Sequence, residues 1–263
     1  MKTNWTDLPA GKVNAGFQRI MGAFGENAGT IIDSVIADEQ VASRMANLLM
    51  NNGYELTSSQ AKAREIMGTN FFGIEEAQRH FGLTLSKRQL AYMAEVPFSE
   101  ETLRACKDTH ILVAYIPTSI VSVRAKTAGV KLPENHRMFY GQDWYDKNEV
   151  GNGVSALEWH LVLKTSVPDS KSKAWSQQKV MVDATNIDRV PEADVMVYTI
   201  IGHFLETGVR LFEKEYVRTS TLGSGGNRVY VGGFGSKGLF VSYWRGDGRY
   251  DGLGVASSRK IEA

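Results

Sequence analysis

The stretch that decides the fold runs from residue 216 to residue 244 and reads YVRTSTLGSGGNRVYVGGFGSKGLFVSYW. Three runs within it, 216–220, 228–234 and 239–244, mix β-branched and aromatic residues, which suit a pleated and half-buried surface. Glycines stand between these runs and can supply the positive φ angles that tight turns require. The stretch therefore predicts a β-meander close to the C-terminus.

Polar and aromatic residues in and beyond this meander predict that it is the working surface of the protein. Arginine and lysine can neutralise phosphates, while rings such as those of Tyr216, Tyr243 and Tyr250 can stack on bases. Because side chains alternate along a strand, some rings should face solvent while the valines face a core. The candidate binding residues are Arg218, Arg228, Tyr230, Trp244, Arg245, Arg249, Arg259 and Lys260.

The leading hypothesis from these residues is a binding or interaction protein whose contact surface is the Arg/Tyr/Trp-rich meander. Nucleic acid or another anionic ligand fits this surface, and a protein partner or a second copy of the chain fits it as well. The chain has 30 basic and 29 acidic residues and a formal net charge of +1. Only a local basic patch, and not the overall charge, can therefore attract a nucleic acid.

The region before the meander predicts an arm, a set of helices and a mixed region. Residues 1–29 are rich in glycine, alanine and asparagine, which is typical of an arm that is flexible or becomes ordered on a partner. Residues 30–107 carry apolar residues at helical spacing, with helix stops at glycines and before a proline. The region 108–263 adds strands at about 111–116 and 159–164.

A further apolar pattern at 192–207 predicts a helix that covers one face of the sheet. We therefore expect an α+β protein in which a helical N-terminal region packs on a mainly antiparallel sheet. The helical region 30–107 and the region 108–263 should fold together as one unit. The arm at 1–29 also permits a third hypothesis, in which the chain is a structural subunit that reaches a neighbour in an assembly.

Composition excludes several classes of protein. The single cysteine, Cys106, can form no internal disulfide and no zinc ribbon, and the five histidines show no metal-ligand spacing. No apolar run reaches the roughly 18–20 residues of a membrane span, and the first residues lack the apolar stretch of a signal peptide. These features predict a cytoplasmic protein with no membrane partner, no metal and no cofactor.

Two arrangements support the competing hypothesis of a hydrolase. Ser170 and Lys173 form a Ser-x-x-Lys pattern, which on one helical turn would let the lysine amine activate the serine as a nucleophile. A turn followed by a helix cap explains the same residues. The second arrangement is an acid/base pair of His110 and Asp247, which requires the chain to bring two distant segments together.

Several segments together resemble a family of uncharacterised bacterial proteins. They read NFFGIEEA at 70–77, VPFSEE at 96–101, DTHILV at 108–113, SKSK at 170–173 and RVYVG at 228–232. The resemblance covers about residues 65–260 and implies a bacterial origin and a single co-folded unit. It implies no substrate and no catalytic residue, so the function has to be argued from the site.

Overall fold

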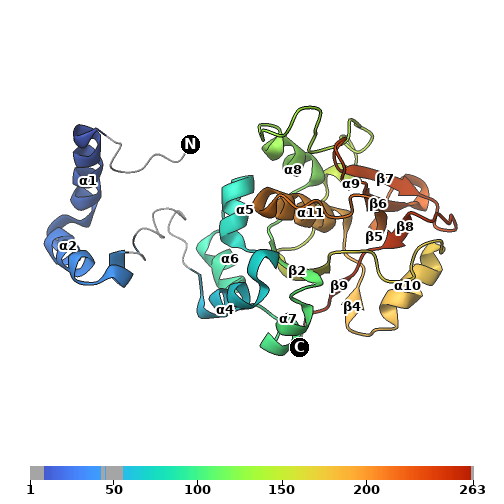
Figure 1. The fold of residues 1–263 in the computed structure, drawn as a ribbon, viewed down its shortest axis with the longest axis horizontal. Helices are drawn as coiled ribbons and strands as arrows, with labels where there is room; N and C mark the ends of the chain where they lie inside the picture. The colour runs from blue at the N-terminus through green and yellow to red at the C-terminus, as the bar shows by residue number, and fades with distance from the viewer. Residues whose placement is uncertain (1–8, 43–44, 46–55, 262–263) are drawn as a thin grey trace. The chain divides into compact units, whose positions relative to one another are not determined.

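The protein has an α+β fold, shown in Figure 1. The computed structural model describes residues 9–42, 45 and 56–261. Contacts within the chain divide it into two units, residues 1–55 and residues 56–263. Residues 56–107 therefore group with the strands of the C-terminal region, whereas residues 30–55 group with the N-terminal segment.

The N-terminal unit is helical over most of its described residues, and the expected arm over 1–29 stays a prediction. Helix α1 spans Ala10–Phe24, the 3-10 turn η2 spans Gly25–Asn27, and helix α2 spans Ala28–Ala37. None of the side chains in α1 or α2 is buried. Val13, Phe17, Ile20 and Phe24 recur at helical spacing, and the interleaved glycines concealed this pattern. Within the predicted helical region, α2 ends at Ala37 because Asp38 is extended, and residues 43–44 and 46–55 of that region lie outside the described residues.

The first of two sheets in the C-terminal unit has the strand order β1-β2-β3-β9-β4. Strands β1 and β2 are parallel, and every other pair is antiparallel. The expected strands near 111–116 and 159–164 are thereby confirmed as β2 and β3, and every residue of β2 is buried. The bounds are β1 Phe71–Phe72, β2 His110–Tyr115, β3 Glu158–Leu163, β4 Asp188–Arg189 and β9 Ser258–Arg259.

The second sheet contains the predicted meander and one strand that the sequence did not reveal. Its order is β7-β6-β5-β8, with β5, β6 and β7 antiparallel and β8 parallel to β5. The bounds are β5 Tyr216–Leu222, β6 Arg228–Gly232, β7 Phe240–Trp244 and β8 Leu253–Val255. A 3-10 turn, η4, at Ser224–Gly226 joins β5 to β6.

Short helices surround the sheets, and their ends follow local sequence signals. Side chains of Thr57, Ser86 and Ser99 accept hydrogen bonds from backbone N–H groups in the first turns of α4, α6 and α7. Gly82 ends α5 in the left-handed conformation, with φ of 60°. The helices are α4 Ser58–Met67, η3 Gly68–Asn70, α5 Ile74–Phe81, α6 Lys87–Tyr92, α7 Glu100–Cys106, α8 Ile120–Thr127, α9 Glu149–Asn152 and α10 Trp175–Asp183.

Helix α11, Ala193–Thr207, is the centre of the C-terminal unit. It contacts β1 and β2 of the first sheet as well as β5 and β6 of the second, so it packs between the two sheets. All residues from Ala193 to His203 are buried, as expected for a helix that is covered on every side. At Gly202 a side chain would meet the Phe72 ring at 2.8 Å, so the glycine allows β1 to approach the helix closely.

Candidate functional site

The second sheet has two unlike faces. On one face, α11 contacts β5 and β6, and the side chains of Val217, Val229, Val231 and Val241 are fully buried. The strand register places Tyr216, Gly232 and Phe240 side by side on the opposite face, with Arg218, Tyr230 and Ser242 in the next row. The predicted alternation is therefore confirmed: the valines enter the core and the aromatic residues line the outer face.

Seven residues on this outer face line a hollow of about 350 Å³, called here the aromatic groove. Tyr216 and Phe240 contact each other edge to face across β6, with ring centroids 6.0 Å apart, because Gly232 between them has no side chain. Trp244 is 44% exposed and Tyr250 is 52% exposed, so two rings remain open to a ligand. The lining residues are Tyr216, Tyr230, Phe240, Trp244, Arg249, Tyr250 and Leu253.

The loop between β7 and β8, residues 245–252, forms one wall of the groove. Backbone N–H groups of Ser172 and Trp175 donate to carbonyl oxygens of Tyr250 and Gly246 in this loop, at 3.1 Å and 2.7 Å. A side chain at Gly248 would meet the indole nitrogen of Trp244 at 2.1 Å, so this glycine lets the loop lie against the tryptophan. The backbone at Ser172 and Trp175 and the indole of Trp244 therefore hold the loop in place.

Arg218 extends from β5 and supports this wall, which corrects its expected role as a binding residue. It is fully buried, because the 245–252 loop and α10 cover its position on the outer face. Its guanidinium donates to the carbonyl oxygens of Lys173, Arg245 and Gly248 and to Oε1 of Gln178, at 2.6–3.2 Å. Burial lowers the pKa of Arg218. We therefore regard Arg218 as a residue that positions the groove.

Three arginines of the predicted set lie on or near the groove. Arg228 stacks over the Trp175 ring at 4.3 Å and donates to the carbonyl oxygen of Ser220, so its guanidinium is already engaged. Arg245 is exposed and pairs with Asp247, with Nε to Oδ1 at 3.5 Å. Arg249 lines the groove, is exposed, and makes no hydrogen bond or ion pair with any residue that the structure describes. Arg249 is therefore the cation best placed to meet a ligand.

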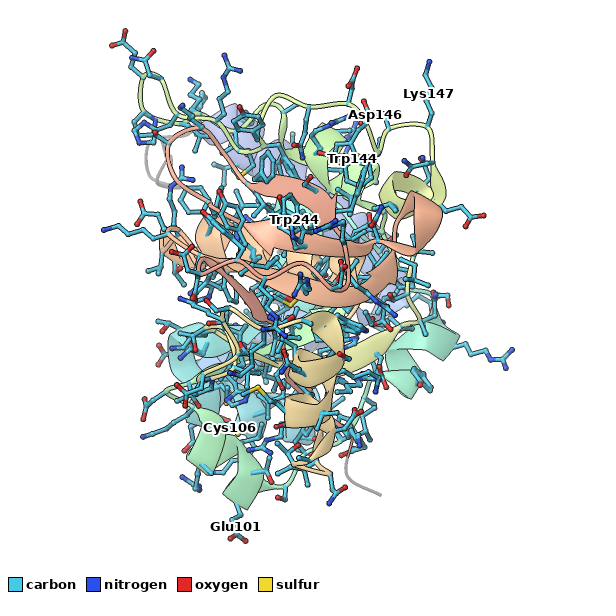
Figure 2. All side chains as sticks on the ribbon, turned by 90° about the vertical axis from the view of Figure 1, so that its right-hand side faces the viewer. Glu101, Cys106, Trp144, Asp146, Lys147 and Trp244 are labelled. Atoms are coloured by element: carbon cyan, nitrogen blue, oxygen red, sulfur yellow. The ribbon has the colours of Figure 1, made fainter. Side chains whose placement is uncertain are left out.

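Arg259 and Lys260 do not belong to this surface, although the sequence grouped them with it. Arg259 lies in β9 of the first sheet and pairs with Asp188 at 3.1 Å, and the Lys260 amine donates to the carbonyl oxygen of Asn186. Both line a separate hollow that also includes Cys106. Figure 2 shows Cys106 and Trp244 in opposite halves of the C-terminal unit.

The Ser170 and Lys173 pair is not arranged as a nucleophile and a base. Both residues lie in the loop before α10 and not on a helical turn. Ser170 is fully buried, and its hydroxyl donates to the carbonyl oxygen of Val167 and accepts from the N–H of Val255. The hydroxyl therefore serves two backbone groups that tie this loop to β8.

The His110 and Asp247 pair is not brought together either. His110 begins β2 in the first sheet, where Nδ1 lies 2.8 Å from the Thr109 hydroxyl. Burial, with Arg259 and Lys164 nearby, lowers the pKa of His110 to about 4. Asp247 lies in the 245–252 loop of the second sheet, is 79% exposed and pairs with Arg245. No described contact joins the two residues, so this version of the hydrolase has no geometric support.

Comparison with family models, with curated proteins and with solved structures finds no match to this chain. The resemblance to a bacterial family stays a prediction, and the function rests on the site itself. Among the described residues, no group of three or more His, Cys, Asp and Glu residues could hold a metal ion. Within the same residues, no helix is long and apolar enough to cross a membrane.

Sequence reasoning missed two residues of the groove, Phe240 and Leu253. Phe240 stands four positions before Trp244, so period-two alternation along β7 could have placed both rings on one face. Tyr243 has the opposite phase and packs against Trp144, with ring centroids 4.9 Å apart. Leu253 carried no such signal, because it joins the groove only through the pairing of β8 with β5.

Proposed function

We propose that the protein is a binding protein that engages single-stranded nucleic acid through the aromatic groove. The observation that carries the proposal is the group of uncovered rings on the outer face of the second sheet beside Arg249, a cation without a partner among the described residues. Proteins that bind single strands combine aromatic platforms for bases with cations for phosphates. In this groove Trp244 and Tyr250 are the platforms.

The dimensions of the groove favour an unpaired base over a duplex. A hollow of about 350 Å³ admits one base between rings, and in a duplex each base face is already covered by its neighbours. Arg245 and Arg249 are the two exposed arginines at this wall, so about two phosphates should be neutralised. For a single strand this corresponds to a slope of about −1.4 in log affinity against log salt.

The test is binding of a fluorescently labelled single-stranded oligonucleotide, measured by anisotropy over a salt series. Trp244→Ala should weaken binding by about 5- to 150-fold, which corresponds to the roughly 1–3 kcal/mol of one stacked base. Arg249→Ala should weaken binding and reduce the salt slope by about 0.7. Tyr92→Ala and Lys147→Ala remove an exposed ring and an exposed cation outside the groove and should change neither quantity.

The outcomes separate nucleic acid from the other ligands that fit this surface. Binding of a mononucleotide as tight as that of the oligonucleotide would assign the groove to a free nucleotide. Absence of binding to either probe at low salt, with the variants still folded, would overturn the proposal. A protein partner would then be the remaining hypothesis for these rings.

A further inference from the structure

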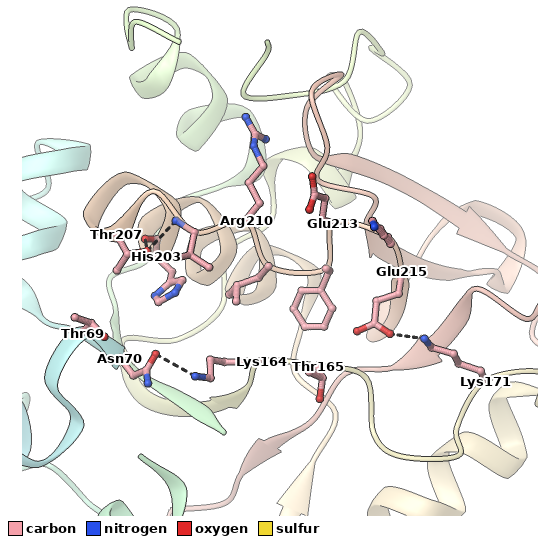
Figure 3. A pocket seen from close by; sticks show the side chains of 14 residues that line it. Thr69, Asn70, Lys164, Thr165, Lys171, His203, Thr207, Arg210, Glu213 and Glu215 are labelled. Carbon is pink, nitrogen blue, oxygen red and sulfur yellow. Dashed lines mark hydrogen bonds and ion pairs between the residues drawn. The ribbon is translucent and has the colours of Figure 1, made fainter. Parts of the chain in front are cut away.

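A second and larger hollow, of about 780 Å³, lies outside the aromatic groove. Its walls are the end of η3, the residues after β3 and the segment 208–215 that joins α11 to β5. In Figure 3, Asn70, Lys164 and His203 gather at one end of the hollow, while Lys171 and Glu215 meet at the other. We call this hollow the Lys164 cavity.

Three of the charged residues that line the Lys164 cavity, Lys171, Glu215 and Arg210, are already paired or engaged, and two more, Glu213 and Lys214, are exposed. The Lys171 amine lies 2.6 Å from Oε2 of Glu215, and the same carboxylate accepts from both the N–H and the hydroxyl of Ser166. The Arg210 guanidinium donates to the carbonyl oxygens of Phe234 and Gly235 and stacks on the Phe234 ring. The three engaged groups shape the wall.

Lys164 is different, because no carboxylate in the described part of the chain pairs with it. Its amine donates only to Oδ1 of Asn70, at 3.4 Å, and the side chain is half-buried. Asn70 is itself held in place, because its amide nitrogen donates to the carbonyl oxygen of Lys107 at 2.7 Å. Asn70 therefore orients a half-buried cation toward the cavity without neutralising its charge.

His203 supplies a second polar group without a partner at the same end. Its side chain comes from α11, is only 5% exposed, and neither ring nitrogen hydrogen-bonds to a described residue. The ring nitrogens of His203 are not among the fully enclosed polar atoms that lack a partner, and His203 lines the cavity, so they are accessible to a molecule bound there. Burial and the nearby Lys164 charge lower the pKa of His203 to about 4, so the neutral ring offers one donor and one acceptor.

The backbone of the cavity wall is strained at Phe212. This residue has φ of 51°, which is the left-handed region, and its ring is 5% exposed. A bulky residue in this region is an outlier, and such strain clusters at ligand sites. Together with Leu211, the Phe212 side chain gives the cavity an apolar wall next to its polar end.

We propose that the Lys164 cavity is a second, independent site that binds a small organic anion, with the anionic group on the Lys164 amine and a polar atom of the ligand hydrogen-bonded to His203. The apolar wall takes the carbon skeleton of the ligand. A carboxylate and a phosphate ester share the chemistry that Lys164 recognises, because an ammonium group binds either as a point charge. Thr69 and Thr165 line the same space and carry hydroxyls for further polar atoms of the ligand.

The experiment uses the full chain and three separate probes: inorganic phosphate, glucose 6-phosphate and succinate. Side-chain NMR signals of His203 are followed while each probe is added up to 20 mM, and calorimetry gives the affinity. At least one probe should shift the His203 signals in a saturable way. Lys164→Met should weaken that probe at least tenfold, whereas Lys147→Met, at an exposed lysine outside the cavity, should leave the affinity unchanged.

Each outcome decides a point. Binding of glucose 6-phosphate without succinate assigns a phosphate ester, and the reverse assigns a carboxylate. If Lys164→Met does not fold, Lys164→Arg should fold and retain binding, and His203→Gln should weaken it. Unmoved His203 signals with all three probes, or full affinity in Lys164→Met, would overturn the proposal. Trp244→Ala should bind the same probe normally, so failure at the aromatic groove remains distinguishable from failure here.

Discussion

Replacing Arg218 with methionine should destabilise the C-terminal unit by about 3 kcal/mol. Methionine keeps most of the buried volume and removes the charge and all four donated hydrogen bonds. Two of the acceptors, the carbonyl oxygens of Arg245 and Gly248, belong to the loop that forms one wall of the aromatic groove, and a third, that of Lys173, belongs to the segment that holds this loop. The change therefore tests whether a buried guanidinium holds this wall in place.

The magnitude follows from opposing contributions. A hydrogen bond from a charged donor contributes about 1.5–3 kcal/mol net, so four of them contribute roughly 6–12 kcal/mol. Removing the guanidinium from water costs several kcal/mol, which offsets part of that gain. The carbonyl oxygen of Arg245 also accepts from the N–H of Gly248, so it stays satisfied in the variant. A net loss of about 3 kcal/mol remains, or about a hundredfold in the unfolding equilibrium.

The assay is urea unfolding followed by tryptophan fluorescence, since four of the five tryptophans lie in residues 56–263. Arg245→Met is the matched control, because the side chain of this arginine is 74% exposed and, among the described residues, pairs with Asp247 alone. The control should change stability by less than about 0.5 kcal/mol. A loss below that value for Arg218→Met would refute the reasoning that the buried hydrogen bonds outweigh the desolvation of the charge.

Two further changes test the buried polar groups. Burial holds the pKa of His110 and His203 near 4 and that of His160 near 3 in the folded protein, whereas histidines of the unfolded chain have a pKa near 6.5. Because the unfolded chain therefore binds more protons, lowering the pH from 7 to 5 should reduce the free energy of unfolding by about 1–2 kcal/mol for each of these histidines. Urea unfolding at pH 7, 6 and 5 measures this, and a constant stability would contradict it. Ser170→Ala should cost about 1–2 kcal/mol in the same assay, because the hydroxyl satisfies two backbone groups. An organophosphonate probe should not label Ser170, and labelling there would restore the hydrolase hypothesis.

The sequence by itself determined those elements whose signals are local. The helix at 74–81 ends at Gly82, because glycine readily adopts the left-handed conformation that ends a helix. Helix α7 begins after Ser99, because the Ser99 hydroxyl accepts a hydrogen bond from a free backbone N–H of the first turn. The meander follows from alternation and turn glycines within 216–244. Each of these signals depends on neighbours within a few positions, so no tertiary contact is needed to interpret it.

Only the tertiary structure decided which of the polar residues can meet a ligand. Arg218 and Arg249 look alike in the sequence, but a loop and a helix cover the first and leave the second exposed. Arg259 belongs to the first sheet through a two-residue strand, β9, which is too short to carry any periodicity. Lys164 and His203 meet in one cavity although they lie in different elements. Whether these side chains are buried or paired depends on segments that are distant in the chain, so the sequence next to each residue cannot predict it.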